Sequence, residues 1–208
     1  MDSNQFTIKT QEVIQAAQDY AQTEGHQAIE NAHLLKGIFL KDADVVPYLF
    51  KQSQVNPKTI ELALDRILES QSKVSGGQIY LSPKAQETLQ LALRTAKENG
   101  DEYATVEMLL LALIDSKDQI GQLLRDAKLD KKKVIKDIMD LRNGEKITSN
   151  QQEGTYKSLE KYAKNGEQSV SEVRQRVAQA LAEQEQDPQR FAPLFFEALD
   201  NGFIPGGR

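Results

Sequence analysis

The sequence predicts an all-α protein: a duplicated four-helix repeat that forms an eight-helix pseudo-twofold bundle, followed by a linker and a C-terminal helical hairpin. Two observations predict this fold. Residues 6–69 and 81–142 follow one pattern at an offset of about 75 residues, which indicates a duplicated supersecondary unit. Within each copy, apolar residues recur at helical spacing. Neither copy can bury its apolar side alone, so we expect the two to pack face to face.

The duplication is visible in matching residues. Lys9 matches Lys84, Gly25 matches Gly100, and Leu34-Leu35 matches Leu109-Leu110. Beyond the second helix the offset falls by about one residue, so that Val55 matches Leu129. A one-residue deletion in the preceding loop explains this change.

The first two helices of the first copy have clear boundaries. One helix is expected from about Thr7 to Glu24, with Val13 and Ala17 among its apolar positions. Gly25 follows, and glycine readily adopts the left-handed conformation that ends a helix. The second helix is expected to start near Asn31 and to carry an apolar side.

Proline marks the start of the next two helices. A short third helix is expected to begin at Pro47, because the first helical position needs no N–H donor. Asn56-Pro57 supplies a cap followed by proline and predicts the start of the fourth helix. The glycine- and serine-rich segment 70–78 is typical of a flexible joint between the copies.

The second copy repeats these signals. Ser82-Pro83 opens its first helix and Gly100 ends it. Thr105 is expected to cap the next helix, with Glu107 in its first turn, where a carboxylate suits the helix dipole. The short third helix is expected at residues 120–127, and a fourth, capped by Asp130, runs to Leu141.

The composition changes after the second copy. We therefore expect three segments: the repeat domain at 1–145, a polar linker at 146–168 with a short helix at 156–164, and a helical tail at 169–208. Ser169 and Glu172 fit a capping box at the start of one tail helix, and Asp187-Pro188 starts the other. The second helix carries several phenylalanines. A lone hairpin cannot bury them all, so we expect it to dock on the repeat domain or on another chain.

Composition excludes several functions. The net charge is −5, and the one basic triplet, 131–133, is flanked by aspartates, so we expect no nucleic-acid binding. The absence of cysteine excludes disulfides. No apolar run approaches the ~20 residues of a membrane span, and no secretory signal is visible, so we expect no membrane partner and a cytoplasmic location. His26 and His33 lack a third ligand at metal-binding spacing, so no metal or cofactor is expected.

Several segments resemble the Clp N-terminal domain, in the form found at the front of ClpB-type protein disaggregases. They are F-T-I-K-T-Q-E, Q-A-I-E-N-A-H-L-L, K-V-S-G-G, Y-L-S, G-D-E-Y, L-R-N-G-E-K-I-T-S and Y-K-S-L-E-K-Y-A, in this order between residues 6 and 163. The resemblance implies a bundle of eight helices in two pseudo-symmetric halves. It also implies a mobile domain on a hexameric ring that first contacts unfolded or aggregated protein.

The chain departs from the family after Tyr162-Ala163. The family continues through an Asp-Pro-Val-Ile-Gly-Arg segment into an ATPase module, but here two tail helices follow. The phosphate-binding pattern Gly-x-x-x-x-Gly-Lys-Ser/Thr does not occur in the sequence. We therefore expect no ATPase activity, and no enzyme of any kind. The chain is either a stand-alone relative or a fusion of this domain with an unrelated tail, unless it has been excised from a disaggregase.

The resemblance also implies a substrate groove. Its polar members are Thr7, Asp101 and Glu107, and its apolar members are Leu91, Thr95 and Met108. Thr95 departs from the family, in which a leucine is common at this position. Spacing supports one of them: Leu91 lies about 200° around its helix from Leu89, which is in the apolar stripe, so it should face away from the core. It then contacts either a partner or the joint between the copies. Each polar residue also has a purely structural interpretation. Thr7 can cap its helix, Glu107 can interact with the helix dipole, and Asp101 can support the loop in which it lies.

The leading functional hypothesis is a non-catalytic, monomeric module that captures unfolded or aggregated protein segments in a shallow apolar groove. An adaptor or a Clp ATPase is a further expected partner. The alternative is a regulatory interaction module, in which the aromatic tail helix docks on a partner or occludes the groove.

Overall fold

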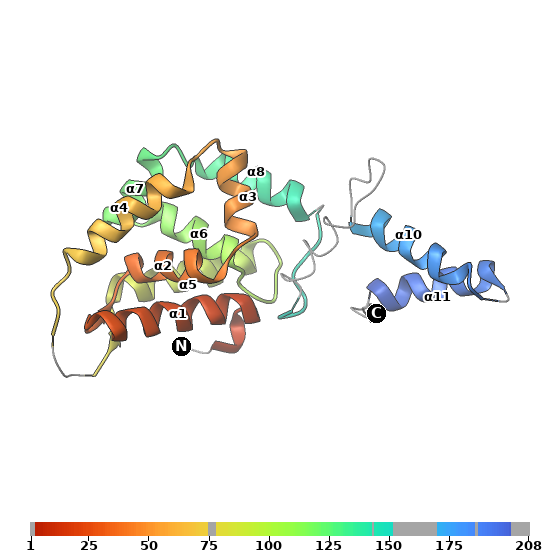
Figure 1. The fold of residues 1–208 in the computed structure, drawn as a ribbon, viewed down its shortest axis with the longest axis horizontal. Helices are drawn as coiled ribbons and strands as arrows, with labels where there is room; N and C mark the ends of the chain where they lie inside the picture. The colour runs from red at the N-terminus through yellow and green to blue at the C-terminus, as the bar shows by residue number, and fades with distance from the viewer. Residues whose placement is uncertain (1–2, 75–77, 143, 152–169, 186, 201–208) are drawn as a thin grey trace. The chain divides into compact units, whose positions relative to one another are not determined.

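Eight helices form the part of the chain that contains the duplication (Figure 1). The computed structural model describes residues 3–74, 78–142, 144–151, 170–185 and 187–200. The chain divides into two units, residues 1–153 and 154–208, and each is described by itself. In the first unit the helices are α1 (Ile8–Glu24), α2 (Asn31–Lys41), α3 (Val45–Gln52), α4 (Pro57–Glu69), α5 (Pro83–Glu98), α6 (Val106–Asp115), α7 (Gln119–Asp126) and α8 (Lys131–Arg142). A short 3-10 helix, η1 (Ser3–Gln5), precedes them.

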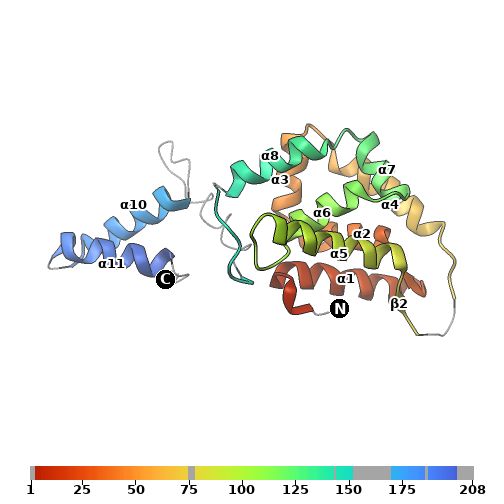
Figure 2. The ribbon, with the colours of Figure 1, turned by 180° about the vertical axis from the view of Figure 1, so that it is seen from behind.

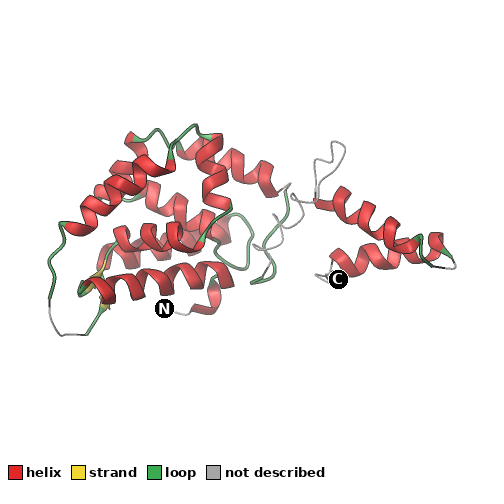
Figure 3. Cartoon of the chain, in the orientation of Figure 1, coloured by secondary structure: helices red, strands yellow, loops and turns green. Residues whose placement is uncertain are grey.

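The predicted helix boundaries are largely confirmed. Thr7 and Ser82 are the N-caps of α1 and α5, and each side-chain oxygen accepts a hydrogen bond from a backbone N–H three residues on. Gly25 and Gly100 have φ angles of 75° and 77°, the left-handed conformation expected after each first helix. The all-α fold class is confirmed (Figure 3).

One predicted helix start and one predicted capping bond are corrected. Helix α3 begins at Val45 rather than Pro47, because the buried Asp42 carboxylate accepts hydrogen bonds from the Val45 and Val46 N–H groups and caps the helix two residues earlier. Thr105 is at the N-cap position of α6, but its hydroxyl makes no capping bond. It accepts instead from Arg142, at 2.9 Å.

A two-stranded parallel sheet that the sequence did not predict joins the halves. Strand β1 (Ala28–Ile29) pairs with β2 (Tyr80–Leu81), which leads into α5 (Figure 2). In the other direction, Phe6, which leads into α1, forms a parallel bridge with Ala104. The Ser82 N–H donates to the Ile29 carbonyl and the Thr7 N–H to the Ala104 carbonyl, both at 3.0 Å. In each copy, the residues just before the first helix therefore pair with the loop between the first and second helices of the other copy. A pseudo-twofold axis requires such a matched pair of contacts.

The second helix of each copy lies at the centre of the core. Helix α6 packs against α1, α3, α5, α7 and α8, and all of its residues except Asp115 are buried. Helix α2 packs against α1 and α4 of its own copy and against α5, α6 and α7 of the other. The face-to-face packing of the two copies is confirmed. A glycine allows one close approach: a Cβ on Gly37 would lie 2.3 Å from the Val13 carbonyl oxygen of α1.

The segment after α8 returns to the bundle. Ile147 is buried, and its carbonyl accepts from the Glu102 N–H at 2.8 Å. The Asn150 carbonyl accepts from the N–H of Ile8, the first residue of α1. Residues 146–151 of the expected linker are thus in contact with the repeat unit. The short helix expected at 156–164 lies outside the described residues.

The second unit contains α10 (Val170–Ala182) and α11 (Pro188–Asp200), which pack against each other. Val173, Ala178 and Ala182 are buried, whereas Leu194 is 52% exposed. Two helices thus occur where the sequence predicts a hairpin. The expected cap Ser169 lies outside the described residues.

Candidate functional site

Two of the predicted polar residues meet at a buried arginine. Arg142, at the end of α8, contacts Asp101 in the loop after α5, with 2.6 Å between Nη1 and Oδ2. It also contacts Glu107 in the first turn of α6, with 2.9 Å between Nη2 and Oε1. All three side chains are at least 90% buried. Burial alone would lower the pKa of Arg142, but Glu107 and Asp101 outweigh it and raise the pKa, so the guanidinium stays charged.

Sequence reasoning missed Arg142, although a signal was present. Val134 and Ile138 are buried on α8, and Arg142 continues their spacing of four residues. An arginine on a buried stripe requires an acidic partner, because an unpaired charge is costly to bury. The Glu107 Oε2 atom, also buried, has no hydrogen-bond partner in the described part of the chain.

Thr7 lies beside this cluster and is fully buried. Its hydroxyl is 2.8 Å from the Thr10 hydroxyl and accepts from the Thr10 N–H, as a helix cap does. Its N–H is bonded to Ala104, in the same loop that holds Asp101. The three polar residues are therefore close together. In this conformation Thr7 caps α1, and Asp101 and Glu107 pair with Arg142, so they do not form the exposed edge of a groove.

The three apolar residues differ in their access to solvent. Met108 is 2% exposed, and its sulfur lies 3.7 Å from the Asn99 side-chain nitrogen. Thr95 is half-buried on α5. Leu91 is half-buried, packs partly against the core and lines a hollow of about 150 Å³. None of the described joint residues, 70–74 and 78, lines this hollow, so these residues do not support the alternative in which Leu91 contacts the joint.

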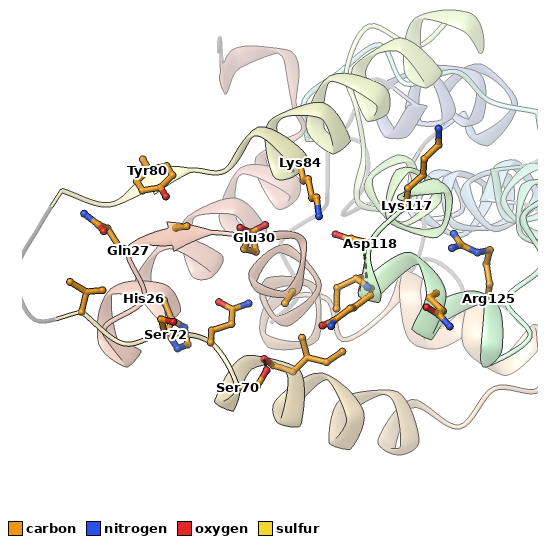
Figure 4. A pocket seen from close by; sticks show the side chains of 18 residues that line it. His26, Gln27, Glu30, Ser70, Ser72, Tyr80, Lys84, Lys117, Asp118 and Arg125 are labelled. Atoms are coloured by element: carbon orange, nitrogen blue, oxygen red, sulfur yellow. Dashed lines mark hydrogen bonds between the residues drawn. The ribbon is translucent and has the colours of Figure 1, made fainter.

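A larger cleft, which sequence reasoning did not find, adjoins this hollow. It has a volume of about 800 Å³ and lies between β1, β2, the end of α4 and the start of α7. Figure 4 shows Lys84 and Arg125 on either side of Asp118, with His26 and Ser72 at the other end. Lys84, Lys117 and Asp118 line both the cleft and the hollow at Leu91, so the two are neighbours. No sequence motif marks the cleft, because its walls come from both copies.

Two histidines form a hydrogen-bonded chain at one wall of the cleft. The Glu30 N–H donates to His33 Nδ1 at 2.9 Å, so the proton of a neutral His33 is on Nε2. That nitrogen lies 3.0 Å from His26 Nδ1, to which it donates. Burial lowers the pKa of His33 to about 4 and also lowers the pKa of His26. Both rings are therefore neutral at pH 7.

The described residues provide no group of three His, Cys, Asp or Glu side chains placed to hold a metal ion. Within the same part of the chain, none of the helices combines the length and the apolar character that a membrane crossing needs.

The fold and these surfaces define a class: a duplicated all-α domain whose candidate sites are grooves. The Clp repeat (R) N-terminal domain matches residues 5–127, which is more than half of the chain. The chain therefore belongs to the Clp N-terminal domain family. This domain is not itself catalytic.

The chain is similar to ClpB chaperones. It is 43% identical over 165 residues to the ClpB chaperone of Bacteroides thetaiotaomicron, covering 79% of this chain and 19% of that protein. It is 36% identical to the ClpB chaperone of Porphyromonas gingivalis, with the same coverage. The chain thus spans about a fifth of the length of these relatives.

Solved structures share the fold. The N-terminal domain of Hsp104 from Candida albicans has a TM-score of 0.63 and 20% identity, covering 70% of this chain and 97% of that one. The N-terminal domain of ClpD from Arabidopsis thaliana has a TM-score of 0.51 and 17% identity, covering 65% of this chain and 98% of that one.

Proposed function

We propose that this chain is a substrate- or adaptor-binding module of a cytoplasmic Clp chaperone system, and that it captures unfolded or aggregated polypeptide in a shallow apolar groove. One observation carries the proposal: among the three predicted apolar contacts, Leu91 is a large side chain that remains half-buried and lines a hollow on the face of α5. An apolar contact of this size suits weak binding of many sequences, with Kd values in the micromolar range or above.

The predicted polar residues have a structural role near the other end of α6. Asp101, Glu107 and Arg142 fix the start of α6 and the loop after α5 by buried charge-assisted hydrogen bonds, whereas the hollow at Leu91 is lined by the end of α6, at Ala112 and Asp115. Thr95 and Met108 complete the proposed apolar surface. Met108, at 2% exposure, contacts a client only after a local side-chain movement.

The test is binding of reduced casein, followed by fluorescence anisotropy, to the wild type and to Leu91→Asp. Leu62→Asp is the matched control, because Leu62 is 65% exposed and lines neither the cleft nor the hollow. We expect Leu91→Asp to weaken binding about tenfold and the control to bind as the wild type does. If Leu91→Asp and Leu62→Asp, both folded by circular dichroism, bound casein equally well, the groove at Leu91 would not be the binding site.

A second candidate function has its own support. Helix α11 exposes Leu194, and a hollow of about 710 Å³ lies between α10 and α11, lined partly by Pro193 and Phe196. An aromatic helix with an exposed apolar side suits docking in a groove. In this alternative, the tail binds a partner or covers the chain's own groove. If it covers the groove, deletion of residues 169–208 increases casein affinity; unchanged affinity excludes occlusion.

A further inference from the structure

Three cationic side chains in the cleft of about 800 Å³ lack acidic partners. Lys84, Lys117 and Arg125 line it, and none of the three forms a salt bridge within the described residues. The Arg125 guanidinium donates to the Ile114 and Ser116 carbonyls, which leaves its charge without a carboxylate. The cleft therefore brings three positive side chains together in a chain whose net charge is −5.

The two carboxylates that line the cleft are already engaged. The Glu30 carboxylate accepts from the Ser82 hydroxyl at 2.8 Å and from the backbone N–H of His33. Asp118 accepts from the Ser116 hydroxyl and the Asn31 amide. It also accepts from two N–H groups at the start of α7, at 3.1 Å each. These bonds belong to helix capping and to contacts between the two copies, and neither carboxylate forms a salt bridge with Lys84 or Lys117 in the described part of the chain.

The duplication provides an internal comparison. In the first copy, Lys9 lies 2.6 Å from Asp42 in the loop after the second helix. Lys84 has the same place at the start of α5, but the matching loop, 116–118, contributes Lys117 to the cleft lining, and its Asp118 forms no salt bridge with Lys84 in the described residues. The first copy therefore pairs its lysine with its own aspartate, whereas the second copy has two lysines that line a cleft without such a partner.

We propose that this cleft binds an acidic segment of a client or adaptor polypeptide, whose Asp or Glu side chains pair with Lys84 and Lys117. This inference rests on the proposed function, because it takes the ligand to be a polypeptide. Three features favour a peptide over a small anion. The volume of about 800 Å³ is far larger than an inorganic anion needs. Amide side chains from Gln27 and Gln71 line it and suit backbone groups. The hollow at Leu91 is next to the cleft and shares Lys84 and Lys117 with it, so one segment can place an aliphatic side chain near Leu91 and acidic side chains near the lysines.

The experiment uses the full chain and two fluorescein-labelled ten-residue peptides. Both contain the same leucines; one has Asp and Glu at four other positions, and the other has Asn and Gln there. Affinities are measured by anisotropy at two salt concentrations for the wild type, for Lys84→Gln/Lys117→Gln, and for Lys97→Gln/Lys132→Gln. The last double variant carries the same change in charge at exposed lysines that do not line the cleft.

We expect the acidic peptide to bind the wild type about tenfold more tightly than the neutral one, with the difference reduced by salt. The cleft variant loses this difference and the control variant keeps it. Equal loss in both variants means non-specific attraction and overturns the inference. Equal affinity of the wild type for the two peptides also overturns it but leaves the proposed function standing, whereas binding of neither peptide contradicts both. Competition by 10 mM inorganic phosphate that abolishes the preference would identify a small-anion site instead.

Discussion

Glu107 and Arg142 lie 35 residues apart in sequence and form a buried ion pair, with 3.0 Å between the Arg142 Nε and the Glu107 Oε1. The pair joins the first turn of α6 to the end of α8. Because Arg142 also binds Asp101 and Thr105, this one side chain holds together three segments of the second copy.

Replacement of Arg142 by methionine should destabilise the domain strongly. The change leaves two buried carboxylates without a counter-charge, which costs about 3 kcal/mol of unfolding free energy. Urea unfolding followed by circular dichroism measures this loss. Adding Glu107→Gln to the variant should recover part of it, because one uncompensated charge is removed. A loss below about 1 kcal/mol for Arg142→Met would show that the cluster is not a structural anchor.

The pKa of His33 predicts a loss of stability in acid. Its pKa is about 4 in the folded protein, below its ordinary value of 6.5, so the unfolded chain binds this proton more readily. The stabilisation is therefore complete above pH 6.5 and is lost as the pH falls from 6.5 to 4, by about 3 kcal/mol at most. NMR titration should show the His33 ring protons inflecting near pH 4. An inflection near pH 6.5 would contradict the hydrogen-bonded chain through His26.

Replacement of Gly37 by alanine should destabilise the bundle. Alanine is normally favoured over glycine within a helix by about 1 kcal/mol. Here the new Cβ would lie 2.3 Å from the Val13 carbonyl oxygen, so α1 and α2 must move apart. We expect a net loss of about 2 kcal/mol in urea unfolding. Gln90→Ala, at an exposed site on α5, should change stability by less than about 0.5 kcal/mol. A more stable Gly37→Ala protein would show that the two helices can separate freely.

Ser82→Ala should cost more than Asn56→Ala, although both remove an N-cap. Asn56 is exposed and bonds only the Lys58 N–H, so its removal should cost about 1 kcal/mol. Ser82 is buried, caps α5 and donates to the Glu30 carboxylate of the other copy, so its removal should cost about 2 kcal/mol. The two variants are compared by thermal and urea unfolding. Equal losses would mean that the Ser82–Glu30 bond contributes little to joining the copies.

Local signals predicted most helix boundaries correctly. The cap-plus-proline pairs at Asn56-Pro57 and Ser82-Pro83 and the glycines after α1 and α5 act within one turn of the chain, so the sequence alone specifies them. The start of α3 was predicted wrongly, because the Asp42 carboxylate competes with proline as a start signal.

The arrangement of the candidate site could be predicted from the sequence only in part. The resemblance supplied the six predicted residues, but it did not indicate that Asp101 and Glu107 share Arg142, or that Met108 is almost fully buried. The cleft with Lys84 and Lys117 depends on residues from both copies, which no local pattern relates.

The sequence by itself determined that the chain is helical, duplicated and closed face to face, because periodicity, capping and repetition depend on neighbours along the chain. Only the tertiary structure decided which polar groups are buried as partners and which line an open cleft. Asn31 and Asp118 are 87 residues apart and come from different copies, and Asp101 and Arg142 are 41 residues apart within one copy, so no local pattern relates either pair.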